Sequence, residues 1–348
     1  MGQAAGRGDV RHACRAALAL TALALAALAA GCGEKSEDVA ATPETTELNV
    51  TLDWFPNPDH VAIFEAQNQG YFRDVGLDVR THVPSDPAAP IKQVAAGRTD
   101  LAVSYQPEVL LAREQGLPVV AVAALVQRPL TSLMATAKSG VRSVRDLRGK
   151  RVGTAGIPYQ SAYLKTILAR ADVPASSVKE TNVGASLLPA MLSGKVDATL
   201  GAFWNVEGVE LRARRQRPWI VPVDRLGVPA YDELVLVANE DDVDERRDDL
   251  RLFISAVARG ARQARSSPAT ATRNLIDNND DLRPGTTRTS VGATLPTLFP
   301  EQRDRPFGHL DPVAWRNYAG WMVDNGLLDE TPDVNEALTN DLLPGEGL

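Results

Sequence analysis

A carboxylate, a large aromatic ring and a histidine lie close together in the segment Asp53–His60. The segment directly follows Leu48–Leu52, whose alternating and β-branched residues predict a strand. In open α/β sheets, ligands bind beyond the carboxyl ends of the strands. Trp54 offers a flat face to a planar ring, and Asp53 can accept hydrogen bonds from an amine. We therefore expect Asp53, Trp54 and His60 to contact a ligand.

A second polar group follows the next buried strand expected in the chain. Ser104 and Tyr105 are the candidate ligand contacts here, because Ser104, or the backbone amides that open the next helix, could hold a polar group of the ligand. The alternative is a plain helix start with Pro107 in its first turn. The segment Asp53–His60 has the same kind of alternative, a purely structural role, in which its aromatic residues would belong to the core and Asp59 would cap a helix.

Two further groups follow strand-like runs in the second half of the chain: Gly156, Pro158 and Tyr159, and then Trp204, Asn205 and Glu207. The first group fixes a loop, allows a close backbone approach to a ligand and supplies a ring that can stack. The second joins a ring to an amide and a carboxylate. Tyr231 and Glu233 come next. For Glu207 and Glu233 the alternative is a solvated surface or a salt bridge.

Together these groups predict a site for a planar ligand that carries amino groups, with rings to stack on it and carboxylates at its edge. The sequence contains no GxGxxG fingerprint, P-loop, nucleophile elbow, HExxH or CxxC motif. A general acid and base could be assembled from the carboxylates, but no spacing requires it. We therefore expect no catalytic residue, no cofactor and no metal.

Composition narrows the class of protein. A chain of 348 residues is expected to form two domains or lobes, and 44% hydrophobic with 23% charged residues is ordinary for a globular protein. The net charge of −7 argues against a nucleic-acid partner. The only cysteines are Cys14 and Cys32, so no disulfide framework is expected, and four histidines leave little material for a metal site.

Strand and helix patterns alternate from Leu48 to Leu125, which predicts an α/β fold with a mainly parallel sheet. The same alternation of strands and helices then repeats further along the chain. Within it, Ala96–Asp100 and Ser193–Asp197 share a small residue, Gly, a basic residue and a final Asp. We expect two similar lobes, each a mainly parallel sheet flanked by helices. The chain is expected to cross between them near Gln127–Met134 and Glu233–Ala238, so that a ligand binds in the cleft at a hinge.

The expected boundaries follow from these crossings. Residues 48–130 begin lobe 1, residues 131–233 form lobe 2, and residues 234–348 return to lobe 1 and add C-terminal helices. The basic run Arg212–Arg217 is expected on a helix surface, with lipid headgroups or a partner as the alternative.

The N-terminus has the pattern of an export signal. Three arginines precede an uncharged stretch, Ala16–Ala30, that is too short to span a membrane comfortably. Small residues then lead to Cys32, which predicts a lipoprotein signal peptide over residues 1–31 and a lipid on Cys32, although Ala29 stands where Leu is usual. The alternatives are an uncleaved anchor or a chance cysteine. Residues 32–47 are expected to be a flexible tether, and the body to lie outside the cell membrane, anchored to its outer face.

Several of these motifs resemble the NMT1/THI5-like family of solute-binding proteins of ABC importers, which is related to yeast thiamine-pyrimidine synthase. The resemblance covers roughly residues 48–240, and its motifs are Leu52–His60, Gly70–Phe72, Asp146–Gly153 and Phe203–Glu207. It implies a two-lobed type II periplasmic-binding fold that closes around a ligand by a hinge motion. It also implies a thiamine-precursor aminopyrimidine as ligand and an ABC importer permease as partner.

Other functions stay open at this point. Relatives bind riboflavin, alkanesulfonates or taurine; a flavin needs a longer cleft, and a sulfonate needs a cationic group, for which Arg128 is the candidate. The synthase branch uses a cysteine-rich motif and a histidine at the position of His60, but this chain has no cysteine after Cys32, so we expect no enzyme. A lipid-anchored interaction module would need an exposed patch instead of a cleft.

Overall fold

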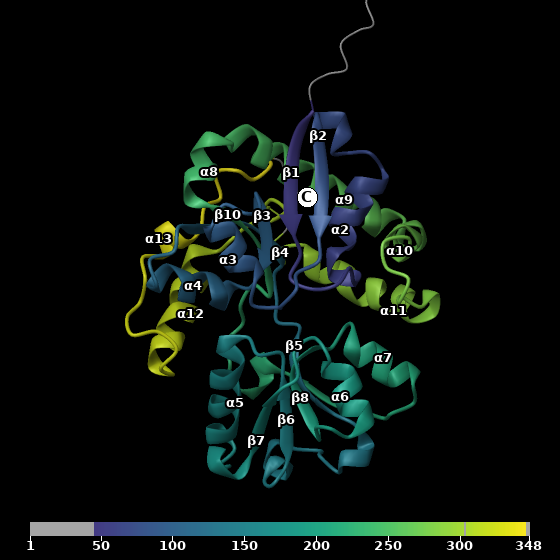
Figure 1. The fold of residues 1–348 in the computed structure, drawn as a ribbon, viewed down its shortest axis with the longest axis vertical. Coiled ribbons are helices and arrows are strands. Elements are labelled where there is room, and N and C mark those ends of the chain that lie inside the picture. The colour runs from purple at the N-terminus through teal and green to yellow at the C-terminus, as the bar shows by residue number, and fades with distance from the viewer. Residues whose placement is uncertain (1–44, 303, 346–348) are drawn as a thin grey trace, which may run out of the picture. The chain divides into compact units, whose positions relative to one another are not determined.

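The computed structural model describes residues 45–302 and 304–345, in which two five-stranded sheets form (Figure 1). The part that holds the first sheet is named lobe 1, and its strands lie in the order β2 (Leu77–His82), β1 (Thr46–Thr51), β3 (Leu101–Ser104), β10 (Leu234–Asn239) and β4 (Val119–Val126). The part that holds the second is lobe 2, with the order β7 (Lys179–Asn182), β6 (Arg151–Thr154), β8 (Ala198–Phe203), β5 (Thr131–Ala135) and β9 (Trp219–Pro222).

Each sheet contains one strand that runs against the rest. β10 pairs antiparallel with β3 and β4, and β5 pairs antiparallel with β8 and β9. Both are the first strand that the chain forms after it passes from one lobe to the other. The other paired strands run parallel. The predicted α/β fold with two mainly parallel sheets is therefore confirmed.

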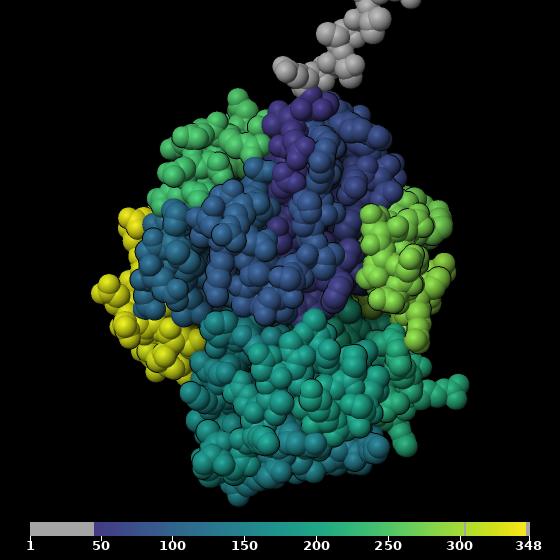
Figure 2. All heavy atoms as spheres, in the orientation of Figure 1, coloured from purple at the N-terminus to yellow at the C-terminus, as the bar shows by residue number. Residues whose placement is uncertain are grey.

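Helices cover both sheets. Those before β5 and after β10 belong to lobe 1: α2 (Val61–Asn68), α3 (Pro90–Ala95), α4 (Gln106–Glu114), α8 (Glu240–Glu245), α9 (Arg247–Ser266), α10 (Pro268–Ile276), α11 (Pro284–Thr294), α12 (Pro312–Asp324) and α13 (Val334–Ala337). Lobe 2 holds α5 (Pro158–Arg170), α6 (Leu187–Ser193) and α7 (Glu207–Ala213). In Figure 2 the teal surface of lobe 2 lies against the purple and blue surface of lobe 1.

The five-residue repeat has the same structural role in both lobes. Gly97 and Gly194 follow α3 and α6 with φ of +63° and +77°, a left-handed conformation that favours glycine. Asp100 then accepts the backbone N–H of Asn49 in β1 at 2.5 Å, and Asp197 accepts that of Arg151 in β6 at 2.9 Å. Each aspartate thus ties the start of its strand to the neighbouring parallel strand.

Some local expectations differ from the structure. β1 begins at Thr46, inside the stretch expected to be a tether. The helical segment after β1 begins as a 3₁₀ turn, η1 (Pro58–His60), and Asn57 rather than Asp59 caps it, since the Asn57 side chain accepts the backbone N–H of Asp59. The basic run lies only partly on a helix, because α7 ends at Ala213 and Arg215 and Arg217 have positive φ.

The predicted signal peptide, the lipid site Cys32 and most of the tether lie outside the described residues. Within residues 45–302 and 304–345, the helices are all too short or too polar to cross a membrane.

The long helix α9 packs on α2, and Gly260 lies directly against the α2 backbone at Ala62 and Ala66. We expect Gly260→Ala to lower the free energy of unfolding by roughly 1–3 kcal/mol, because a Cβ there would overlap the carbonyl oxygen of Ala62 and lie 2.9 Å from the backbone nitrogen of Ala66. Gly320 in α12 is the matched control, since a Cβ there meets nothing within 4 Å. Gly320→Ala should stabilise by about 0.5–1 kcal/mol. Urea denaturation measures both, and equal effects would contradict the prediction.

Candidate functional site

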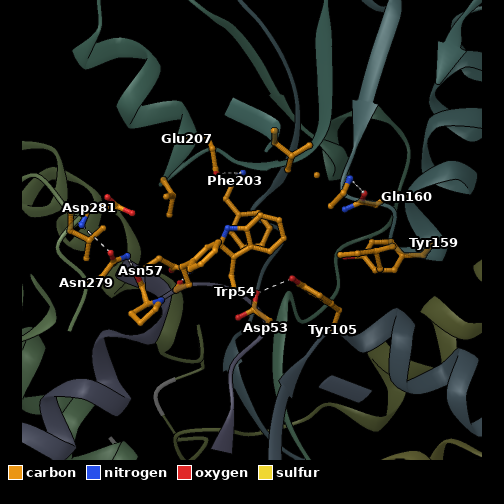
Figure 3. A pocket seen from close by; sticks show the side chains of 18 residues that line it. Asp53, Trp54, Asn57, Tyr105, Tyr159, Gln160, Phe203, Glu207, Asn279 and Asp281 are labelled. Carbon is orange, nitrogen blue, oxygen red and sulfur yellow. Dashed lines mark hydrogen bonds between the residues drawn. The ribbon is translucent and has the colours of Figure 1, made fainter. Parts of the chain in front are cut away.

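A cavity of about 210 Å³ lies between the lobes (Figure 3). Lobe 1 lines it with residues that follow β1 and β3 and with a loop between α10 and α11: Asp53, Trp54, Phe55, Pro56, Asn57, Tyr105, Asn279, Asp281 and Leu282. Lobe 2 lines it with residues that follow β6, with the end of β8 and the residues after it, and with the start of α6: Ala155, Ile157, Tyr159, Gln160, Leu187, Gly201, Phe203, Val206 and Glu207. Side chains from both lobes therefore meet at the ends of strands.

Asp53 is the most firmly held carboxylate of the cavity. It is buried, its Oδ2 accepts the hydroxyl of Tyr105 at 2.8 Å, and its Oδ1 lies 2.7 Å from Nε2 of His60. Nδ1 of His60 accepts the backbone N–H of Asn57 at 3.3 Å. Because Nδ1 is an acceptor there, the ring proton is on Nε2, and His60 donates to Asp53 as a neutral imidazole.

Tyr105 and Tyr159 present neutral hydroxyl-bearing rings. Burial raises the pKa of both phenols well above the usual value, and the nearby carboxylate of Asp53 adds to the effect at Tyr105. The two rings meet edge to face with centroids 5.8 Å apart. Figure 3 shows the indole of Trp54 in the middle of the view, with Phe203 beside it and Tyr159 to one side. The cavity thus has aromatic faces from both lobes.

Glu207 supplies a second carboxylate on the side of lobe 2. Its Oε2 accepts the backbone N–H of Phe203 at 2.8 Å, which fixes the side chain and leaves Oε1 for another donor. Burial raises the pKa of this carboxyl group. The arrangement can accept hydrogen bonds from amino groups at the edge of a ring held between the aromatic side chains.

Comparisons with known proteins agree with this geometry. A family model described as NMT1/THI5 like matches residues 57–271. A formylaminopyrimidine-binding protein of Halalkalibacterium halodurans is 34% identical over 307 residues, covering 87% of this chain and 93% of the relative. A Haemophilus influenzae protein named for thiamine biosynthesis is 34% identical over 291 residues, covering 83% of this chain and 90% of the relative. The chain belongs to the NMT1/THI5-like family, as its motifs predicted.

More distant proteins extend the comparison. A 4-amino-5-hydroxymethyl-2-methylpyrimidine phosphate synthase of Saccharomyces cerevisiae is 25% identical over 251 residues, covering 68% of this chain and 74% of that enzyme. The solved alkanesulfonate-binding protein of Xanthomonas axonopodis pv. citri, bound to MOPS, superposes with a TM-score of 0.67 at 17% identity and covers 85% of this chain and 99% of that protein. This similarity shows that the NMT1/THI5-like chain has the periplasmic-binding-protein fold.

Five of the predicted contact residues line the cavity of this NMT1/THI5-like protein: Asp53, Trp54, Tyr105, Tyr159 and Glu207. His60 lies behind Asp53 with no exposed surface. Ser104 is also buried, and its hydroxyl donates to Oε2 of Glu108 at 2.9 Å. Burial raises the pKa of Glu108 to about 7. His60 and Ser104 therefore do not line the cavity as expected. Instead, His60 supports Asp53, and Ser104 supports Glu108.

Near the loop after β6, Gly156 and Pro158 do not line the cavity. Both are exposed; Gly156 has a φ of +83° and Pro158 is the first residue of α5. Trp204 turns its indole away, and its Nε1 donates to the carbonyl of Pro129 at 3.1 Å. Their structural role is to shape the loop and to support the crossing, so we revise the expected ligand contacts here as well.

Glu233 joins the two segments that connect the lobes. It is fully buried, and its Oε2 accepts the backbone N–H of Leu130 at 2.6 Å and that of Thr131 at 2.7 Å. Its Oε1 accepts the hydroxyls of Thr131 at 2.8 Å and Tyr231 at 3.2 Å. Burial raises its pKa to about 7, although these bonds oppose the shift. Glu233 and Tyr231 therefore belong to the hinge and not to the cavity lining.

Sequence reasoning missed the loop Asn279–Leu282, which reaches the cavity from the C-terminal part of lobe 1. Nδ2 of Asn279 donates to the carbonyl of Pro56 at 2.8 Å and so fastens this loop to the segment after β1. No periodicity or motif marks such a contact between distant segments. Gly201 also lines the cavity, and its residue type is a signal that the sequence does contain, because only glycine fits at this place. Its φ is +115°, and Gln160 occupies the space that a Cβ would fill.

Proposed function

We propose that this protein is an extracytoplasmic solute-binding protein, anchored through a lipid on Cys32, that captures a thiamine-precursor aminopyrimidine and delivers it to the permease of an ABC importer. The observation that carries the proposal is the cavity between the lobes, which combines aromatic faces with the carboxylates of Asp53 and Glu207. The name of the Halalkalibacterium halodurans relative adds the ligand class.

The size of the cavity favours a single ring. Its volume of about 210 Å³ lies below the roughly 300–1,000 Å³ of sites for drug-sized ligands. A pyrimidine with short substituents suits that space, whereas the three fused rings of riboflavin need more.

The charges of the cavity argue against a sulfonate. The residues described as lining it include Asp53, Glu207 and Asp281 but no arginine, lysine or histidine. Arg128, the cation considered from the sequence, lines a separate cavity and lies 3.4 Å from Glu301. A sulfonate or taurine would meet carboxylates without a compensating cation.

A pyrimidine synthase is the alternative of another class, because the yeast relative carries that name. The chain has no cysteine after Cys32 to match the cysteine-rich motif of the synthase branch. His60 is fully buried, and both ring nitrogens are engaged with Asp53 and Asn57. These features favour binding over synthesis.

A thermal-shift panel tests the proposal on the purified protein with formylaminopyrimidine, hydroxymethylpyrimidine, thiamine, riboflavin and taurine. We expect a pyrimidine to raise the unfolding midpoint by several degrees, since a ligand at about 100 times its Kd adds roughly 2.7 kcal/mol. A shift with riboflavin or taurine alone would reject the ligand class. No shift with any compound would favour an interaction module.

A further inference from the structure

Three buried polar side chains meet where lobe 2 contacts lobe 1, beside the cavity. Asp59 belongs to η1, Thr294 ends α11, and Asn205 follows β8 of lobe 2. Nδ2 of Asn205 donates to Oδ1 of Asp59 at 2.6 Å and to Oγ1 of Thr294 at 2.7 Å. Oγ1 of Thr294 lies 3.3 Å from Oδ1 of Asp59 and donates to it. Asn205 thus makes the hydrogen bonds that tie lobe 2 to lobe 1 at this point.

Two oxygens in this cluster find no hydrogen-bond partner within residues 45–302 and 304–345: Oδ2 of Asp59 and Oδ1 of Asn205. Both are buried, and a buried polar atom without a partner costs about 1–3 kcal/mol. They belong to the same two groups that already share the bond from Nδ2 of Asn205 to Oδ1 of Asp59. A carboxylic acid and a primary amide form a cyclic pair in which each group donates once and accepts once, and one proton on Oδ2 would complete that pair.

The surroundings favour that proton. Burial raises the pKa of Asp59 well above its usual value, the hydrogen bond from Asn205 opposes this, and the charges of Asp53, Glu207 and Glu233 raise it further. Among the residues that the structure describes, no cation pairs with Asp59. The other charged or titratable groups of the packed elements are engaged or exposed: His60 on Asp53, Glu65 on Gln69 and Asn274, Glu210 on Arg214 and Arg283, and the exposed Arg288.

We propose that Asp59 and Asn205 are positioning residues that hold the lobes closed over the ligand through a carboxylic acid–amide pair in which Asp59 carries the proton. The inference rests on the proposed function, because it states how the affinity of the same cavity for its ligand is regulated. When Asp59 ionises, its proton leaves to solvent, and Oδ2 of Asp59 and Oδ1 of Asn205 both stay buried as acceptors without a donor among the described residues. Closure then becomes less favourable, and the affinity for the ligand falls.

Calorimetric titration with formylaminopyrimidine from about pH 5 to about pH 9 tests this inference. We expect the wild-type affinity to fall about 5- to 150-fold as the pH rises, the range of a typical coupling between sites. Asp59→Asn keeps both hydrogen bonds of the pair and has no proton to lose, so it should bind tightly across the range. Asp59→Leu should bind weakly at every pH. Titration of the ligand itself affects all variants alike.

Asp224→Asn is the matched control, since Asp224 is exposed, lies in η6 (Val223–Leu226) of lobe 2 and does not line the cavity. It should reproduce the wild-type profile. An affinity of the wild type that does not change with pH, or an Asp59→Asn variant that follows the wild-type profile, would overturn the inference. Other buried carboxyls titrate as well, but they are present in both proteins and cancel in the comparison.

A readout without ligand separates this inference from the proposed function. The infrared spectrum of the ligand-free protein near neutral pH should contain the C=O band of a protonated carboxyl group that disappears in Asp59→Asn. If that band is unchanged by the substitution, the proton is not on Asp59 and the inference fails. If the band disappears as expected but no pyrimidine binds, the proposed function fails while the protonated pair stands.

Discussion

Replacing Glu233 by alanine is expected to lower the free energy of unfolding by about 2–6 kcal/mol, because the backbone N–H groups of Leu130 and Thr131 would lose their acceptor inside the protein, at about 1–3 kcal/mol each. The loss should be visible as a lower midpoint in thermal or urea unfolding. It should also loosen the link between the two crossing segments, so that ligand affinity falls with stability.

Glu233→Gln is the matched control for this prediction. An amide oxygen in the place of Oε2 can keep both backbone hydrogen bonds, and the hydroxyls of Thr131 and Tyr231 can turn to accept from the amide nitrogen. We expect this variant to lose about 1 kcal/mol or less. If the alanine and glutamine variants were equally unstable, the charge of Glu233 and not its acceptor geometry would account for its role.

Trp54→Ala is expected to weaken the binding of the pyrimidine by about 1–3 kcal/mol, a factor of roughly 5 to 150 in Kd, because it removes a ring from the centre of the cavity. Since Trp54 is only partly buried, the fold should survive. Titration calorimetry measures the affinity, and circular dichroism verifies the fold.

Trp219 in β9 provides the matched control, because it is also partly buried but does not line the cavity. Trp219→Ala should bind the pyrimidine as the wild type does. Trp54→Phe keeps a ring and should lose less affinity than Trp54→Ala. Wild-type affinity in Trp54→Ala would remove the indole from the binding site.

The sequence pattern predicted the strands that stand out as apolar or alternating runs, and it missed β5, β7 and β9. β7 is an edge strand of polar, mostly exposed residues, so only its backbone pairing with β6 identifies it. β5 is fully buried but overlaps the segment Gln127–Met134 that was expected to be a crossing, and β9 has only four residues. Such strands depend on their partners in the sheet more than on their own composition.

The position of the site followed from a general property of α/β sheets, while the direction of individual side chains did not. Residues after β1, β3, β6 and β8 were expected to meet, and side chains from all four places do line the cavity. The sequence could not distinguish Trp54, which enters the cavity, from Trp204, which donates to Pro129. It also gave no reason to expect that buried Asp59 would meet Asn205. These outcomes depend on packing between distant segments.

The position of the antiparallel strand β10 sets the order in which the two lobes can be completed during synthesis on the ribosome. It lies between β3 and β4, yet ribosomes complete β4 at Val126 long before they reach Leu234. All strands of lobe 2, in contrast, come from one continuous stretch, Thr131–Pro222. The lobe that emerges first therefore finishes last, and the facing edges of β3 and β4 stay open to wrong partners until β10 arrives. A nascent chain stalled before Leu234 would carry a complete lobe 2 beside a lobe 1 without its inner strand.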